Sequence, residues 1–69
     1  MRGKVSWVDS VRNFGFIECD DSMFDDHFFH KSGCNSPFIN YLEGSKVEFT
    51  SHRTAKGMRA EGVSLIGED

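Results

Sequence analysis

Turn-forming residues interrupt this chain at short intervals, and their spacing is what most limits the folds open to it. In the 69-residue sequence they gather at residues 9–13, 20–22, 32–37, 43–45 and 54–57. None of the segments between them has the sustained 3.6-residue apolar period of a helix. The chain is therefore predicted to fold from short strands, with helix limited to single turns.

The segments between the turns have the composition of strands. Residues 5–8, 14–19, 27–30, 47–50 and 60–66 are rich in β-branched and aromatic side chains. Five strands, with one longer connection between Lys31 and Ser45, predict an all-β fold that closes into an antiparallel barrel. A chain this short has room for one small core, so residues 1–69 are interpreted as a single domain.

Aromatic side chains outnumber the places available in so small a core. By alternation, Phe14 and Phe16 share one side of their strand, and in the next segment Phe28 and His30 lie opposite Phe29. The predicted core consists of Val5, Ile17, Phe29, Val47, Phe49, Val63 and Leu65. Phe14, Phe16 and Phe28 are left over, and clustered exposed aromatics usually mark a binding face.

The charges are segregated along the chain. The formal net charge of −3 argues against a polyanionic partner only if the charges are evenly spread. Five acidic residues crowd into a stretch of nine around one predicted turn, at Glu18, Asp20, Asp21, Asp25 and Asp26. Basic residues fall in or beside the aromatic segments, at Lys4, Arg12, Lys31, Lys56 and Arg59. The acidic turn is interpreted as solvated, or alternatively as repelling nucleic acid from one edge of the site.

Several classes of protein are disfavoured by the composition. No apolar run approaches the roughly 20 residues of a membrane span, and no signal-peptide hydrophobic region follows the first residues, so a cytoplasmic location is expected.

Cys19 and Cys34 are expected to be free thiols, because intracellular thiols stay reduced. His27 and His30 with either cysteine would suit zinc, but histidines three apart in a strand face opposite sides. We expect no metal or cofactor.

Catalysis is also disfavoured. An enzyme needs a nucleophile or an acid–base pair in a cleft shielded from water, and the chain offers only scattered groups such as His30 near Ser32. We therefore expect neither enzymatic activity nor a small-molecule substrate.

Four ordered motifs carry a family resemblance. They are GKVSW at residues 3–7, NFGFI at 13–17, HFFH at 27–30 and KGMRA at 56–60, followed by Val63. Together they resemble the landmarks of the cold-shock domain family over nearly the whole chain. The Phe-Gly-Phe-Ile strand followed by a Phe-x-His strand is far more specific than either alone. The resemblance implies a five-stranded Greek-key barrel of the oligonucleotide-binding type (OB-fold).

The resemblance also implies a binding site. Its base-stacking positions fall on Trp7, Phe14, Phe16, Phe28, His30 and Phe38, and the basic residues Lys4, Arg12, Lys31, Lys56 and Arg59 complete the predicted set. Because every base has a π-face, such a row of rings binds single strands with little sequence preference. The expected partner is single-stranded RNA or DNA, bound by a monomer acting as an RNA chaperone or a modulator of transcription or translation. The alternative is a barrel whose aromatic face has become a protein-interaction module, as the negative net charge would suit.

Some residues depart from the family pattern. Ser6 stands where lysine is usual, Val8 and Lys31 stand where aromatic residues are common, and Asn13 replaces a glycine. Weaker binding than that of a typical member is therefore expected. Lys31 is interpreted either as a phosphate contact or as a solvated edge-strand lysine. His27 occupies an interior valine position, so it is either buried with a hydrogen-bond partner or exposed by a register shift in the turn before it.

Four further residues carry expectations about local structure. Strict alternation places Trp7 beside core-facing Val5, so an exposed Trp7 requires a bulge. Gly15 is predicted to let its strand bend without crowding the interior, or else is simply a tolerated glycine. Phe38 is interpreted equally as a base contact or a loop anchor. Tyr41 and Leu42 are predicted to pin the long loop to the barrel.

Overall fold

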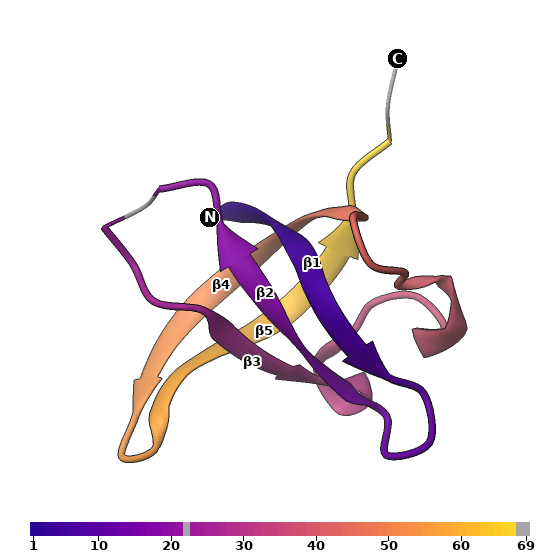
Figure 1. The fold of residues 1–69 in the computed structure, drawn as a ribbon, viewed down its shortest axis with the longest axis horizontal. Helices are drawn as coiled ribbons and strands as arrows, with labels where there is room; N and C mark the ends of the chain where they lie inside the picture. The colour runs from indigo at the N-terminus through magenta and orange to yellow at the C-terminus, as the bar shows by residue number, and fades with distance from the viewer. Residues whose placement is uncertain (22, 68–69) are drawn as a thin grey trace.

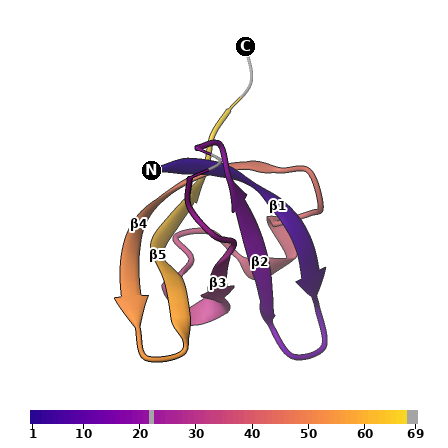
Figure 2. The same ribbon diagram turned by 60° about the vertical axis from the view of Figure 1, so that its left-hand side comes forward.

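The chain forms a closed barrel of five strands. The computed structural model describes residues 1–21 and 23–67. Its strands are β1 (Arg2–Asp9), β2 (Phe14–Cys19), β3 (His27–His30), β4 (Lys46–Thr54) and β5 (Gly57–Leu65), and the long connection holds two short 3₁₀ helices, η1 (Lys31–Gly33) and η2 (Phe38–Asn40). Neighbouring strands follow the order β1-β2-β3-β5-β4, and β4 returns to pair with β1 (Figures 1 and 2). The predicted all-β barrel is confirmed.

One seam of the barrel differs from the antiparallel prediction. Strand β3 meets β5 in parallel through the pair Phe28 and Arg59, whereas the other four seams are antiparallel. The long connection carries the chain from the end of β3 round to β4, so β5 runs in the same direction as β3. This seam places the β4–β5 hairpin beside the aromatic residues of β2 and β3.

The hairpin of β4 and β5 is longer than predicted. Its ladder continues through polar residues to the pair Thr54 and Gly57, and the hydroxyl of Thr54 donates to the Gly57 carbonyl at 2.7 Å. An apolar pattern could not predict this arm, because backbone hydrogen bonds rather than buried side chains hold its tip. In Figure 1 it projects beyond the barrel as a two-stranded arm.

The core contains most of the residues predicted for it. Val5, Ile17, Phe29, Val47, Phe49 and Val63 are buried, while Leu65 is half-buried against them. Buried residues outside the predicted core list are Cys19, Tyr41 and Ala60, together with His27, for which burial was one of two expectations. Within the described part of the chain, no helix has the length and apolar character needed to cross a membrane.

Tyr41 ties the long connection to the barrel. Its side chain is buried, and its hydroxyl donates to the Val63 carbonyl at 2.7 Å. The prediction for Tyr41 is confirmed, but that for Leu42 is wrong, because Leu42 is 64% exposed. The Leu42 amide instead donates to the Ser45 hydroxyl at 3.1 Å, in a turn that leaves the leucine side chain in solvent.

His27 is buried in the core, so the expectation that a register shift exposes it is wrong. It pairs with Ile17 across the β2–β3 ladder and has no exposed surface. Its Nε2 lies 2.7 Å from the Ser51 hydroxyl, and its Nδ1 lies 3.0 Å from the Asp25 carbonyl oxygen. The ring therefore has the polar partners that a buried histidine requires.

The half-buried thiol of Cys34 is expected to react slowly in the folded protein. Burial raises its pKa to about 11, from the ordinary value of 9.0. Because the thiolate is the nucleophile, alkylation by iodoacetamide at pH 8 should be roughly 100-fold slower than in the urea-unfolded chain. The rate is measured by mass spectrometry in a Cys19→Ser variant, so that only Cys34 reacts. Equal rates in the folded and unfolded chains would contradict this expectation.

Candidate nucleic-acid interface

Four aromatic side chains from three strands form one surface group, called here the aromatic cluster: Trp7 of β1, Phe14 and Phe16 of β2, and Phe28 of β3. The centroids of neighbouring rings are 5.5–6.3 Å apart. Phe16 pairs with Trp7 on one side and with Phe28 on the other, so the ladder places the three rings in a row. The three phenylalanines are half-buried, and Trp7 is 43% exposed.

Trp7 reaches this surface through a bulge in β1. The register with β2 shifts between Val5 and Trp7, so Val5 points into the core while Trp7 points outward two residues later. The extra residue is Ser6, whose hydroxyl lies 3.3 Å from the Phe16 carbonyl oxygen. The predicted break in alternation is confirmed.

Gly15 lets the two phenylalanines of β2 share the surface. A Cβ atom at Gly15 would lie 2.4 Å from the Trp7 carbonyl oxygen and 2.9 Å from a ring carbon of Phe29. Both separations are below van der Waals contact, so any side chain would push β1 or the core ring away. The predicted role in avoiding interior crowding is confirmed, and the interpretation of Gly15 as merely tolerated is wrong.

The backbone conformation of the turn before β2 explains why asparagine suits position 13. This residue has φ of +62°, in the left-handed region that asparagine tolerates better than most residues with side chains. The carboxylate of Asp9 accepts from the amides of Val11 and Arg12, and the Asn13 carbonyl accepts from the Lys31 amide at 2.9 Å. The exposed residues Arg12 and Lys31 are thus at the same end of the cluster.

The β4–β5 hairpin forms one wall of a groove beside the cluster. The groove is lined by Phe16, Phe28, Thr54, Ala55, Lys56, Gly57, Met58 and Arg59. The guanidinium carbon of Arg59 lies 5.6 Å from the centre of the Phe28 ring, and its Nε donates to the Glu61 carboxylate. Lys56 and Arg59 are therefore beside the cluster, as the sequence predicted. The contribution of Thr54 and Met58 was missed, because the β3–β5 seam leaves no local signal in the sequence.

His30 lies beside the cluster, but one of its two ring nitrogens already accepts a hydrogen bond within the fold. It pairs with Phe14 across the ladder, on the opposite side of β3 from buried His27. Its Nδ1 accepts from the Ser32 amide at 3.1 Å, at the start of η1. A neutral ring with this bond carries its proton on Nε2, which leaves that nitrogen as the donor available to a ligand.

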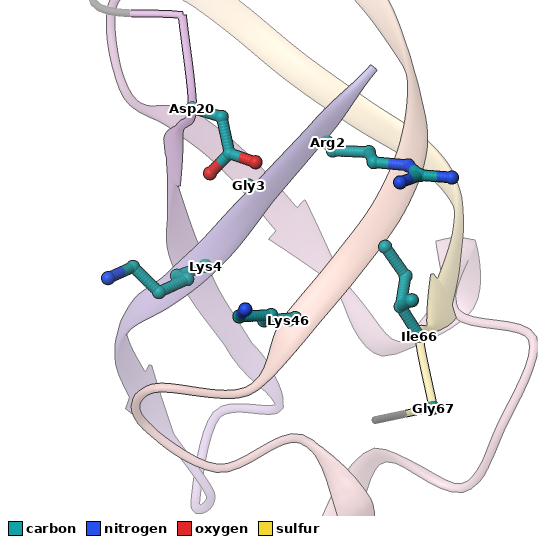
Figure 3. Close-up of a pocket in the computed structure, with 7 residues that line it drawn as sticks. All are labelled: Arg2, Gly3, Lys4, Asp20, Lys46, Ile66 and Gly67. Atoms are coloured by element: carbon teal, nitrogen blue, oxygen red, sulfur yellow. The ribbon is translucent and has the colours of Figure 1, made fainter. Parts of the chain in front are cut away.

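Two predicted site residues lie apart from the cluster. The half-buried Phe38 ring packs against Phe29 and Tyr41, with centroids 5.8 and 6.2 Å away, which is the loop-anchoring arrangement. Lys4 pairs with Glu18 at the acidic end of the β1–β2 ladder, where it lines a separate groove with Arg2 and Lys46 (Figure 3).

The acidic residues mark the opposite end of the cluster from Arg12 and Lys31. Glu18 follows Phe16 on β2, and the loop from β2 to β3 carries four aspartates, all of them exposed: Asp20, Asp21, Asp25 and Asp26. The surface therefore changes from basic to acidic along the length of β2.

A closed five-stranded barrel with stacked rings on one face is the architecture of oligonucleotide-binding modules. The "Cold-shock" DNA-binding domain profile matches residues 1–66. The chain is 40% identical over 65 residues to the cold shock-like protein CspA of Stigmatella aurantiaca, covering 93% of this chain and 94% of that protein. It is 39% identical over 67 residues to a cold shock-like protein of Thermotoga maritima, covering 96% and 98%.

The chain belongs to the cold-shock domain family, whose members generally bind nucleic acid and are not enzymes. Its fold is also similar to a solved structure described as drosophila Unr CSD456, with a TM-score of 0.77 and 20% identity. That match covers 96% of this chain and 26% of the other, and it supports the OB-fold architecture.

Proposed function

We propose that this protein binds single-stranded RNA or DNA with low sequence specificity, through bases stacked on the aromatic cluster. The observation that carries the proposal is the convergence of Trp7, Phe14, Phe16 and Phe28 on one exposed face, next to a groove that holds Lys56 and Arg59. Bases in a duplex hide their faces from such rings, so unpaired strands should be preferred.

The charge pattern supports a route for the sugar–phosphate backbone. Phosphates can be neutralised by Lys56 in the hairpin and by Arg12 and Lys31 at the basic end of the cluster. The aspartates beyond Glu18, at the acidic end, repel phosphates. Arg59 is already paired with Glu61, so its main contribution is to hold the Phe28 ring in place. Lys4 would contact only a strand that continues along β1 past Trp7, toward Glu18.

The proposed cellular role is that of a monomeric RNA chaperone or a modulator of transcription or translation. By mass action, binding to unpaired bases lowers the population of base-paired structures. This role involves no bond making or breaking, so it requires no catalytic group and no cofactor.

Trp7 fluorescence tests the proposal directly. Titration with oligo-dT and oligo-U should quench Trp7 saturably, and the affinity should fall with added salt by about 0.7 log unit per log unit of salt for each neutralised phosphate. Lys56→Gln should make that slope shallower by about 0.7, the value for one neutralised phosphate, and by the same amount for both oligonucleotides. Absence of quenching at micromolar protein would contradict the proposal and favour the protein-interaction module.

A further inference from the structure

Two sulfur atoms and one imidazole nitrogen meet at the end of the barrel opposite the basic end of the aromatic cluster. The Cys19 thiol sulfur at the end of β2 lies 3.3 Å from Nδ1 of His27 at the start of β3 and 3.5 Å from Sδ of Met1. Figure 1 shows the N-terminus beside the end of β2. Residues 1–21 and 23–67 contain no group of three His, Cys, Asp or Glu side chains arranged to hold a metal. The group formed by Cys19, His27 and Met1 is of a different kind, because its third donor is the thioether sulfur of Met1.

The backbone holds Met1 in this position. Its amino group donates to the Phe49 carbonyl at 2.9 Å, and its own carbonyl accepts from the Phe49 amide at 2.8 Å. Met1 thus extends the pairing of β1 with β4 by one residue. Cys19 and His27 are fixed more firmly, since both are buried parts of the barrel.

The two separations measured from the Cys19 sulfur are close to those of ligands that share a metal ion. With metal–sulfur bonds near 2.3 Å and metal–nitrogen bonds near 2.0 Å, ligands at tetrahedral angles are about 3.5 Å apart for a sulfur–nitrogen pair and about 3.8 Å for two sulfurs. The observed 3.3 and 3.5 Å are each a few tenths of an ångström shorter. Adjustments of a few tenths of an ångström, in the Met1 side chain for the sulfur–sulfur pair and in the Cys19 and His27 side chains for the sulfur–nitrogen pair, would complete the geometry.

We propose that Met1, Cys19 and His27 bind one Cu(I) ion. Thiolate and thioether donors select Cu(I), and imidazole also suits copper, whereas a thioether is a poor ligand for zinc. On binding, the sulfur–hydrogen bond of Cys19 breaks, its proton passes to water, and a sulfur–copper bond forms. The Cys19 thiolate and the monovalent ion then cancel in charge, and neither is oxidised or reduced.

The surroundings of His27 suit a metal ligand. When Nδ1 binds the ion, Nε2 carries the ring proton and donates it to the Ser51 hydroxyl, 2.7 Å away. Such a partner fixes the tautomer and orientation of metal-binding histidines. The contact between Nδ1 and the Asp25 carbonyl is given up, and because Asp25 is exposed, water can replace it.

The nearby aspartates favour a cation at this place. The loop from β2 to β3, which joins Cys19 to His27, carries the exposed carboxylates of Asp20, Asp21, Asp25 and Asp26. Their negative charge favours a positive ion beside this loop.

The test is an anaerobic titration of the reduced protein, with Met1 retained, by Cu(I) in competition with a chromophoric Cu(I) chelator. One equivalent should bind in the wild type and in Cys34→Ser, which keeps the three ligands. Binding should be lost in Cys19→Ser and weakened on the order of 10- to 100-fold in Ser51→Ala, which removes only the partner of His27. Circular dichroism confirms that each variant is folded.

Carbon-13 labelling of the methionine methyl groups provides an independent readout, with Ag(I) as a redox-inert probe. The Met1 methyl signal should shift on saturation, while those of Met23 and Met58 serve as internal controls and stay in place. Equal loss of binding in the two cysteine variants, or a Met1 signal that does not move, would overturn the proposal. Oligonucleotide binding, measured separately through Trp7, distinguishes this outcome from failure of the proposed function.

Discussion

Replacing Phe28 or Phe16 with alanine is expected to weaken oligonucleotide binding by about 5- to 150-fold each, because a base stacked on a protein ring contributes about 1–3 kcal/mol. Both rings are central in the aromatic cluster and line the groove of the hairpin, so each loss removes a platform and loosens its neighbours. The cost in stability should be modest, since these rings are half-buried and the core beneath them is complete without them.

Phe24→Ala is the matched control for these two variants. Phe24 has the same exposed fraction as Trp7, 43%, but it lies in the acidic loop between β2 and β3, outside the cluster. Its removal should leave affinity unchanged within a factor of about two, well under 1 kcal/mol. Trp7 titrations measure all three variants. An equal loss in Phe24→Ala, or unfolding of both cluster variants, would contradict the assignment of an exposed stacking site.

Replacing Gly15 with alanine is expected to remove a large share of the free energy of unfolding. A single methyl group there meets the Trp7 carbonyl oxygen and the Phe29 ring, and the oxygen belongs to the backbone, which cannot rotate aside. Overpacking of this kind costs about 1–3 kcal/mol or more. A barrel of this length has only about 3–10 kcal/mol of total stability, so the loss is a substantial share.

Gly67→Ala supplies the control, because a Cβ at Gly67 meets no atom of residues 1–21 or 23–67 within 4 Å. Urea unfolding followed by Trp7 fluorescence should give a midpoint near that of the wild type for Gly67→Ala and a much lower one for Gly15→Ala. If Gly15→Ala unfolded at the wild-type midpoint, the close approach of β1 to β2 would not be a constraint on this position.

The local pattern of the chain was sufficient for the existence and order of the five strands, though not for the ends of β1, β4 and β5, and for which side of each strand faces outward. Alternation has a period of two residues, so it assigns Phe14, Phe16 and Phe28 to one side and Ile17 and Phe29 to the other without knowledge of the rest of the fold. The conflict between Val5 and Trp7 likewise predicted the bulge in β1. Each of these inferences depends on neighbours within one strand or on adjacent strands.

Contacts between distant segments could not be predicted in this way. The β3–β5 seam brings Met58 and Arg59 beside Phe28, and Ser51 satisfies buried His27 from 24 residues away. Phe38 turned toward Tyr41, and Lys4 turned toward a separate groove, because the path of the long loop and the closure of the barrel set their surroundings.

The sequence by itself therefore determined the strands, the faces of those strands and the family, because these follow from side-chain period and local motifs. Only the tertiary structure decided which segments that are distant in the sequence lie next to one another. It joined the hairpin to the aromatic cluster and brought the sulfur atoms of Met1 and Cys19 next to His27. Closure of a barrel depends on pairing between strands far apart in the chain, and no short-range pattern encodes that pairing.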